Sequence, residues 1–290
     1  MNHTLFLRRS SLLLVTVVAA FAAQSRAAES SKAPPTTAPA WVDAMRKTHA
    51  RFTGTHGTFA HFGDSITVSL AFWSGLPYDH KNLGPEGEKA FALVKDYMQS
   101  DCWRNWKGPE FGSEGGMQVT WGEQNVDKWL KKLNPEVALI MFGTNDLREG
   151  RGVEDYTSRT RAIARKCLDN GTVVILSTIP PRTKKLEESR AYADAVRKLG
   201  RELNVPVEDF FQAVISRRPD DWDGSGEAFK GAADSYDVPS LISGDGIHPS
   251  VPKKFAGDYS EEALRNHGYN LRTYITLLSY ADVIREVLKP

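Results

Sequence analysis

The sequence predicts an α/β protein in which a mostly parallel sheet is covered by helices on both faces. Three short apolar runs, at residues 58–62, 137–142 and 173–178, end in Gly, Pro or polar residues, as buried strands do. Longer segments carry apolar residues at three-to-four spacing among charged ones, which is typical of surface helices. These segments are 87–98, 125–133, 153–168 and 187–203. Their alternation with the strands indicates parallel crossovers, so a ligand is expected beyond the carboxyl ends of the strands.

The last segment, residues 271–288, is expected to be an amphipathic helix that serves as a packing element. With 290 residues, of which 41% are hydrophobic, the chain can bury a sizeable core. Its 37 basic and 36 acidic side chains give a net charge of +1. No whole-molecule field therefore favours nucleic acid or an anionic membrane, and the expected partner is a small or neutral molecule.

The N-terminus has the features of a signal peptide that spans residues 1–27. Arg8 and Arg9 precede an apolar run at 12–23, and small residues occupy the two positions that a signal peptidase reads before cleavage after Ala27. The run is shorter than the roughly 20 residues that a spanning helix needs, and no later segment approaches that length without charges. We therefore expect an exported protein, periplasmic or secreted, with no membrane-spanning segment after removal of the signal. The arginine pair leaves the twin-arginine route open.

A Ser/Pro/Thr/Ala-rich linker at 28–40 is expected to separate the signal from one catalytic domain at 41–290. Export would allow a disulfide, and the chain has two cysteines, Cys102 and Cys167. Sequence leaves open whether they pair or lie buried as thiols. Neither has metal-ligand neighbours at a zinc-like spacing, and no metal site is expected.

The first strand is followed by Gly63, Asp64 and Ser65, which puts a serine at a strand-to-helix turn. At that place a hydroxyl can stand exposed at the sheet edge, as a nucleophile must. The same serine could instead cap the helix by accepting a backbone hydrogen bond. The rest of the pattern has to decide between these roles.

The second strand ends in Gly143, Thr144, Asn145 and Asp146, which puts an amide donor on the same rim as Ser65. Such an amide can stabilise an oxyanion, although Asn and Asp are also the usual residues of turns and caps.

Far downstream, Asp245 precedes His248 by three residues. On one turn these side chains can meet, so that the carboxylate holds Nδ1 and leaves Nε2 to take a proton from Ser65. An Asp and a His at this spacing alone more often form a surface turn. Here the pair follows Ser65 far downstream, and the chain order Ser, Asp, His favours a catalytic role.

The three blocks resemble those of the SGNH or GDSL hydrolases, whose signature residues are Ser, Gly, Asn and His, and they occur in the same order between about residues 58 and 249. The resemblance implies a flavodoxin-like three-layer α/β/α sandwich, the SGNH hydrolase fold, and hydrolysis of acyl esters without a cofactor. It also implies that Ser65 is the nucleophile and an oxyanion donor, Asn145 an oxyanion donor, His248 the general base and acid, and Asp245 the residue that orients His248.

The glycine of this signature is harder to locate, because residues 111–116 contain three glycines. Gly112 is the first choice for the oxyanion donor, since its distance to Trp121 and to the Asn145 strand suits the family pattern best. Gly115 and Gly116 stay as alternatives, because any of them provides a backbone donor. Thr67 stands where the nucleophile elbow of ordinary α/β-hydrolases has its second glycine, which argues against a generic lipase.

The substrate class is suggested by aromatic residues between the first two blocks and before the last. Export and these side chains favour an O-acetyl ester of a carbohydrate, although each aromatic residue could equally pack in the core. The residues are Trp103, Trp106, Phe111, Trp121 and Trp222. An aryl ester, a short acyl ester and a lysophospholipid are alternatives, and a catalytically inactive carbohydrate-binding protein is an alternative of another class. The acidic loop at 221–227 lacks the spacing of a calcium loop and is interpreted as a solvated turn.

Overall fold

The α/β class is confirmed by the computed structural model, which describes residues 39–289. The expected signal peptide at 1–27 and all but the last two residues of the expected linker lie outside the described residues. Helix α1 begins at Trp41 and ends at His49. Among the described residues, no helix is both long and apolar enough to cross a membrane.

The sheet has four parallel strands in the order β1-β2-β3-β4. They are β1 (Phe59–Gly63), β2 (Val137–Met141), β3 (Val173–Ser177) and β4 (Val207–Glu208). Every residue of the first three strands is buried, as expected for a parallel sheet that is covered on both faces. The predicted strands agree with these three to within a residue at each end. The two-residue β4 was not predicted, since so short a strand shows no periodicity.

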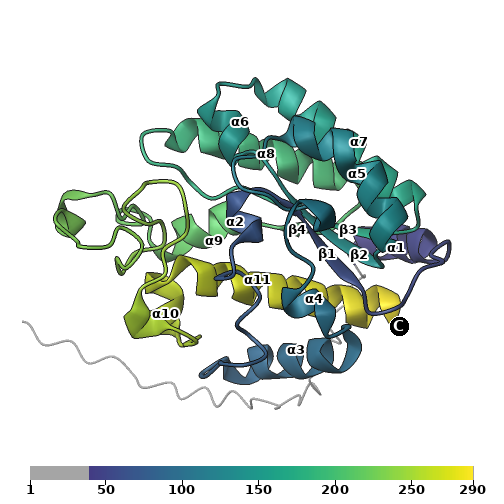
Figure 1. Cartoon of the computed structure of the whole chain (residues 1–290), viewed down its shortest axis with the longest axis horizontal. Coiled ribbons are helices and arrows are strands. Elements are labelled where there is room, and N and C mark those ends of the chain that lie inside the picture. The colour runs from purple at the N-terminus through teal and green to yellow at the C-terminus, as the bar shows by residue number, and fades with distance from the viewer. Residues whose placement is uncertain (1–38, 290) are drawn as a thin grey trace, which may run out of the picture. The chain divides into compact units, whose positions relative to one another are not determined.

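One face of the sheet is covered by α5 (Val119–Leu133), α7 (Val153–Asp169) and α8 (Leu186–Leu203), which lie side by side above the strands in Figure 1. Each of them connects two consecutive strands. Because right-handed crossovers that advance in one direction all pass over the same side, these helices share a face. The predicted helices match them, except that α5 begins six residues earlier than expected.

The other face is covered by helices from elsewhere in the chain (Figure 1). Helix α11 (Gly268–Val283) continues into the π-helix η4 (Ile284–Leu288) and packs against α3 (Gly84–Tyr97). The packing role expected for residues 271–288 is therefore confirmed, but α11 is buried around most of its circumference instead of being amphipathic. Helix α1 contacts β3 and η4 on this side.

Shorter elements connect these layers. They are α2 (Ser65–Val68), α4 (Asp101–Arg104), η1 (Pro109–Phe111), α6 (Thr144–Arg148), α9 (Phe210–Arg217), η2 (Glu227–Phe229), η3 (Lys253–Phe255) and α10 (Glu261–Asn266). Cys102 and Cys167 are both buried and free, so the open question of a disulfide is answered by two separate thiols.

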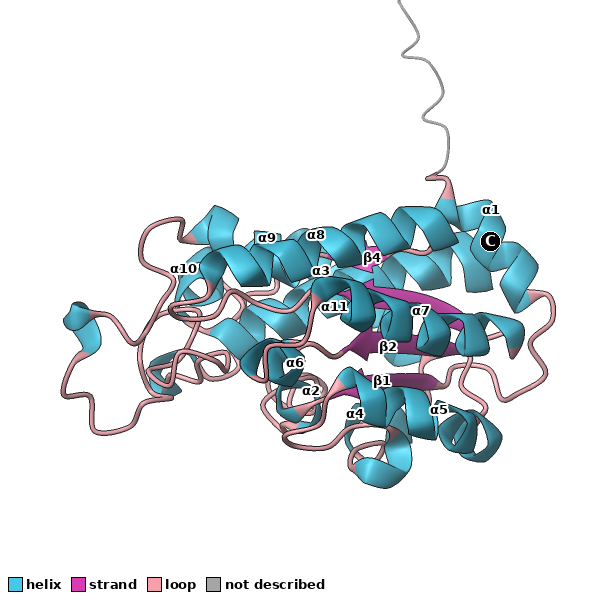
Figure 2. Cartoon of the chain, turned by 90° about the horizontal axis from the view of Figure 1, so that it is seen from above, coloured by secondary structure: helices cyan, strands magenta, loops and turns pink. Residues whose placement is uncertain are grey.

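The end of β1 is the place where the chain changes direction across the sheet. After β1, the segment around Ser113 pairs with Gly63 in a parallel bridge, and the Gly63 N–H donates to the Gly112 carbonyl at 3.0 Å. The chain then returns through α5 to β2 on the opposite side of β1. Such a point opens a crevice at the carboxyl ends of the strands, and α2 and α6 lie there, beyond the tips of β1 and β2 (Figure 2).

Candidate active site

Ser65 is the first residue of α2, directly after β1. The preceding Asp64 is extended and caps the turn, because its Oδ1 accepts a hydrogen bond from the Ile66 N–H at 3.1 Å. Asp64 therefore takes the capping role that the sequence left open for Ser65. Burial raises the pKa of Asp64 to about 6. The serine hydroxyl stays available for chemistry.

Two basic side chains donate hydrogen bonds to α2 and to the residue that follows it. Arg272, fully buried on α11, donates from Nη1 to the Ile66 carbonyl at 2.7 Å and from Nη2 to Thr67 Oγ1 at 3.0 Å. Lys107 Nζ donates to the carbonyls of Thr67 and Ser69 at 2.9 and 3.1 Å. Burial, and then the charge of Arg272, lower the pKa of Lys107 to about 7. The turn that carries Ser65 is thus held by α11 and by the loop between α4 and η1.

His248 joins Ser65 to Asp245. Its Nε2 lies 2.8 Å from Ser65 Oγ, and its Nδ1 lies 2.6 Å from Asp245 Oδ2. A ring that donates from Nδ1 to the carboxylate presents the Nε2 lone pair to the serine proton, so the relay has the geometry of a general-base triad. The structure brings together the three residues that the sequence analysis selected, across 183 residues of chain.

Asp245 is held in its ionised form by its neighbours. Its Oδ1 accepts hydrogen bonds from Ser243 Oγ and from the backbone N–H groups of Ile247 and His248, at 2.7 to 2.9 Å. Burial alone would raise the pKa of Asp245, but these bonds and the one from the His248 ring outweigh it and lower the pKa well below its usual value. The carboxylate can therefore orient the imidazole and balance its positive charge.

Tyr236 is a member of the site that the sequence analysis missed. Its hydroxyl donates to Asp245 Oδ2 at 2.9 Å and lies 3.2 Å from His248 Nδ1. It belongs to the irregular stretch before the Asp245 loop, where no periodicity marks it. The one feature of the sequence that could have indicated Tyr236 was its position, nine residues before Asp245.

Asn145 lies on α6, at the end of β2, and is almost fully buried. Its Nδ2 donates to the Met117 carbonyl at 3.0 Å, so the side chain is held against the glycine loop. The neighbouring Asp146 accepts from the Val119 N–H, with its Oδ2 at 3.0 Å, and from Arg151 Nε at 2.7 Å. Together these contacts bring the loop before α5 onto the rim that carries Asn145.

The contacts of Gly112 favour a packing role over a donor role. Its N–H faces the Pro109 carbonyl, its own carbonyl accepts from Gly63, and a Cβ at this position would collide with the Phe62 ring. The Gly115 N–H donates to Glu114 Oε1 at 3.0 Å. Within the described chain, the Gly116 N–H has no partner, and space is open around the residue. Because Gly116 adjoins Met117, to which Asn145 binds, we shift the choice of oxyanion glycine from Gly112 to Gly116.

The family to which the chain belongs is shown by comparison with models of protein families. Residues 61–252, more than half of the chain, match the model of the GDSL-like lipase/acylhydrolase family. The chain belongs to that family. This GDSL-like acylhydrolase is accordingly a serine ester hydrolase with an SGNH hydrolase fold. No curated protein matches it.

Solved structures similar to this acylhydrolase have low sequence identity. A GDSL-like lipase from Bacteroides thetaiotaomicron is 13% identical, with 83% of this chain and 97% of that one covered and a TM-score of 0.47. The esterase EstA from a Pseudoalteromonas species, inhibited by monoethylphosphonate, is 16% identical, with 81% and 100% covered and a TM-score of 0.47. A catalytic mutant of an acetylxylan esterase from Geobacillus stearothermophilus is 16% identical, with 81% and 96% covered and a TM-score of 0.44. Similarities at this level carry no argument about the substrate.

Most of the aromatic residues expected near the acylhydrolase's substrate are packing residues. Trp103 is buried and stacks on Trp73 at 4.9 Å, and Trp222 is buried as well. Trp121 packs on Trp129 at 4.8 Å. Trp106 and Phe111 are partly exposed, as Trp121 is, and they stack on each other at 6.3 Å.

The carboxylates of the acidic loop at 221–227 of the acylhydrolase accept hydrogen bonds from neighbouring protein groups. Both carboxylate oxygens of Asp221 bind Arg218, at 2.9 and 2.6 Å, and Asp223 Oδ1 accepts from Thr183 Oγ1 at 2.7 Å. These bonds fit the interpretation as a turn.

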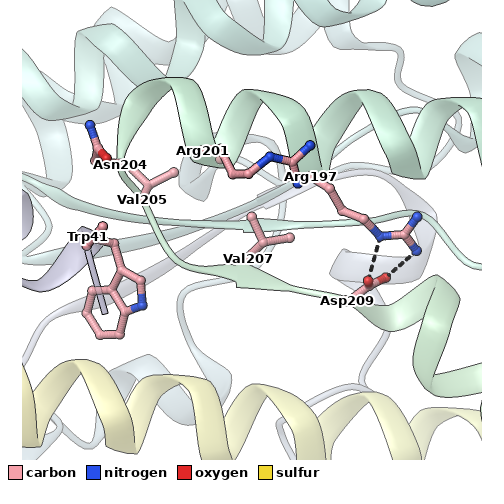
Figure 3. Close-up of a pocket in the computed structure, with 9 residues that line it drawn as sticks. Trp41, Arg197, Arg201, Asn204, Val205, Val207 and Asp209 are labelled. Atoms are coloured by element: carbon pink, nitrogen blue, oxygen red, sulfur yellow. Dashed lines mark hydrogen bonds and ion pairs between the residues drawn. The ribbon is translucent and has the colours of Figure 1, made fainter. Parts of the chain in front are cut away.

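The pocket drawn in Figure 3 lies apart from the triad, between the C-terminal part of α8, strand β4 and the start of α1. Arg197 and Asp209 close one end of it with an ion pair of 2.6 Å between Nε and Oδ2, and Trp41 lies near the other end. None of the residues assigned to the triad or the oxyanion donors lines this pocket.

Proposed function

We propose that this protein is an exported esterase that cleaves O-acetyl esters of carbohydrates through an acyl-enzyme on Ser65. The observation that carries the proposal is the continuous relay from Ser65 Oγ to His248 Nε2, at 2.8 Å, and from His248 Nδ1 to Asp245, at 2.6 Å. Such a relay supplies both a nucleophile and the base that activates it.

In the first half of the reaction, Ser65 Oγ bonds to the ester carbonyl carbon while its proton passes to His248 Nε2. The oxyanion that forms is stabilised by the Ser65 N–H, by the Gly116 N–H and by Asn145 Nδ2. The tetrahedral intermediate then expels the alcohol, which receives the proton from His248 and leaves an acetyl-serine. In the second half, His248 takes a proton from water, the hydroxide attacks the acetyl carbon, and acetate leaves as the proton returns to Ser65.

The carbohydrate part of the proposal depends on Trp106. This residue is partly exposed on the loop that leads to the glycines, and its neighbour Lys107 binds the carbonyls at the end of α2. The loop that carries Trp106 is therefore tied to the nucleophile helix through Lys107, and an aromatic face on this loop could stack on the sugar that carries the acetyl group. Phe111 would extend that surface.

A short acyl or aryl ester or a lysophospholipid is the second candidate substrate, and one observation favours it. Leu70, two residues after α2, is 56% exposed, and an apolar side chain beside the nucleophile would suit a longer acyl chain. Hydrolysis of 4-nitrophenyl acetate, longer-chain esters and an acetylated polysaccharide, by wild type and Ser65→Ala, tests both candidates. Acetate release from the polysaccharide that is lost in Ser65→Ala is expected. A clear preference for long acyl chains would contradict the proposal.

The role of Trp106 can be tested with a matched control. Trp106→Ala is expected to raise KM for the acetylated polysaccharide and to leave that for 4-nitrophenyl acetate unchanged. Trp41→Ala, which removes another partly exposed tryptophan at the pocket of Figure 3, should change neither. Equal effects of the two variants would remove the argument for a sugar.

Export is the remaining part of the proposal, and it depends on the signal peptide expected at residues 1–27. The mature protein recovered from the periplasm or the medium should begin at Ala28, as N-terminal sequencing would detect. An intact Met1 on the recovered protein would contradict cleavage.

A further inference from the structure

A second cluster of histidine and carboxylate side chains lies at the end of the sheet opposite Ser65. Glu136 precedes β2, His56 lies in the loop before β1, and His49 ends α1. His49 Nε2 and His56 Nδ1 lie 2.8 and 2.6 Å from the same oxygen, Glu136 Oε1. One ligand atom from each of the three residues lies within 4.8 Å of the other two.

The carboxylate of Glu136 is completely buried, yet no permanent cation accompanies it. Within residues 39–289, no lysine or arginine forms an ion pair with it; its charged-group contacts are the two histidines alone. The carboxylate instead accepts hydrogen bonds from His49, His56, the Gly57 N–H and Tyr97. A buried carboxylate without a lysine or arginine partner is costly, and a bound metal cation would offset that cost.

We propose that His49, His56 and Glu136 form a binding site for a divalent transition-metal ion, with Zn²⁺ as the probe of choice. Two imidazole nitrogens and one carboxylate oxygen are a ligand set that zinc prefers, at about 2.0–2.2 Å from the metal. Coordination through Nε2 and Nδ1 requires that neither of these two nitrogens carries a proton. Ligands at about 2.0–2.2 Å from a tetrahedral ion lie about 3.3–3.6 Å apart, so each N···O distance to Glu136 Oε1 has to lengthen by roughly 0.5–1 Å from its present 2.6–2.8 Å.

The surroundings of Glu136 suit this role. Its Oε2 accepts from the Gly57 N–H at 2.6 Å, and Tyr97 Oη lies 2.9 Å from Oε1 and 3.0 Å from Oε2. With an ion on Oε1, the Gly57 N–H and the Tyr97 hydroxyl could both donate to Oε2 and orient the carboxylate. The side chain of His56 is 69% exposed, which gives the ion a path of entry and leaves a coordination position for water. The ion would join α1, the loop before β1 and the start of β2.

This site is independent of the esterase reaction. Glu136 lies at the amino ends of the strands and Ser65 at the carboxyl ends, and five residues of strand separate the two edges by roughly 16 Å. The ion is therefore expected to stabilise the fold rather than to take part in ester hydrolysis.

The test is a titration of the tag-free full chain, stripped with a chelator, with ZnCl₂ alone. Calorimetry should find one saturable site per chain, and Tm should rise by about 5–10 °C at a zinc concentration a hundred times the Kd. His56→Asn and His49→Gln place amide nitrogens where the imidazole donors are and can keep the hydrogen bonds to Glu136, but amides are poor zinc ligands. Each should weaken zinc binding by more than about 10-fold.

The control is His248→Ala, which removes the other histidine–carboxylate pair and should bind zinc as wild type does. Each variant is compared with its own metal-free Tm, so a change in basal stability does not affect the conclusion. Absence of a saturable site, zinc binding that persists in both His56→Asn and His49→Gln, or zinc binding that is lost in His248→Ala would each overturn the proposal.

Discussion

The two ends of the sheet use the same chemical pair, a histidine on a carboxylate, in different ways. At the carboxyl ends, Asp245 binds one nitrogen of His248 and leaves the other 2.8 Å from Ser65 Oγ. At the amino ends, Glu136 is shared by His49 and His56, and no nucleophile is bound to either ring. The histidine–carboxylate pair therefore has the geometry of a general base only at the carboxyl ends, where its second ring nitrogen lies at a hydroxyl.

The two ends also differ in how their buried charges are balanced. Arg272 and Lys107 donate to the carbonyls and the hydroxyl of the turn that follows Ser65, whereas within residues 39–289 no lysine or arginine forms an ion pair with Glu136. The turn at Ser65 is therefore held by basic side chains of the protein itself, whereas the cluster at Glu136 is suited to bind a metal cation.

Removing the nucleophile or the base should have the largest effect. Ser65→Ala and His248→Ala are each expected to lower kcat for 4-nitrophenyl acetate by roughly 10⁴- to 10⁶-fold, because either change interrupts the relay. Zinc binding at the other end should persist in both. Residual activity above a hundredth of the wild-type activity in either variant would show that catalysis does not depend on the relay from Ser65 to His248.

Removing an oxyanion donor should have a smaller effect. Asn145→Ala is expected to lower kcat by about 10²- to 10³-fold, which corresponds to about 2.7–4 kcal/mol of transition-state stabilisation. Gln118→Ala, on the loop before α5 that Asn145 binds, removes an acceptor of Arg151 and no oxyanion donor, so it should keep most of the activity. Steady-state kinetics on one ester compares the two, and equal losses would show that Asn145 acts only by holding the loop.

Tyr236→Phe should lower kcat/KM by about 2- to 10-fold, the kinetic equivalent of one hydrogen bond. The acid limb of the pH profile should move to higher pH. Asp245 would lose one donor, so its charge would stabilise the protonated form of His248 more strongly. Tyr78→Phe, at a tyrosine that is 73% exposed, is the control. An unchanged acid limb of the pH profile in Tyr236→Phe would contradict a role of Tyr236 in positioning Asp245 and His248.

Lys107 should affect the pH dependence of stability. Its pKa in the folded state is lowered from 10.5 to about 7, so the folded state binds fewer protons between these values than the unfolded state does. The cost of its burial is therefore fully present below pH 7 and is relieved as pH rises towards 10.5. Urea unfolding at pH 7 and pH 9.5 should show wild type gaining stability relative to Lys107→Met. Parallel curves would contradict this assignment.

The sequence predicted the parts of this molecule that follow from periodicity and from local motifs. Three strands and the helices α3, α7 and α8 were placed to within three residues because their apolar patterns are regular. Ser65 was selected from its place at a strand-to-helix turn, and Asp245 and His248 from their spacing, their order in the chain and the family resemblance. The early start of α5 was missed, since it depends on a hydrogen bond from Val119 to Asp146, 27 residues away.

The parts that sequence did not predict depend on contacts between distant segments. The choice among Gly112, Gly115 and Gly116 requires knowing which N–H is already bound, and the buried state of Trp103 depends on its stacking partner. The cluster at Glu136 joins residues 80 and 87 positions apart, so no spacing rule could find it.

Labelling with a fluorophosphonate probe, followed by mass spectrometry of the digested protein, tests directly whether Ser65 is the nucleophile. A hydroxyl that His248 deprotonates should react, so we expect a single phosphonylated residue, Ser65, and no label in Ser65→Ala or His248→Ala. A folded wild-type protein that stays unlabelled would contradict the catalytic assignment and leave a carbohydrate-binding protein as the better interpretation.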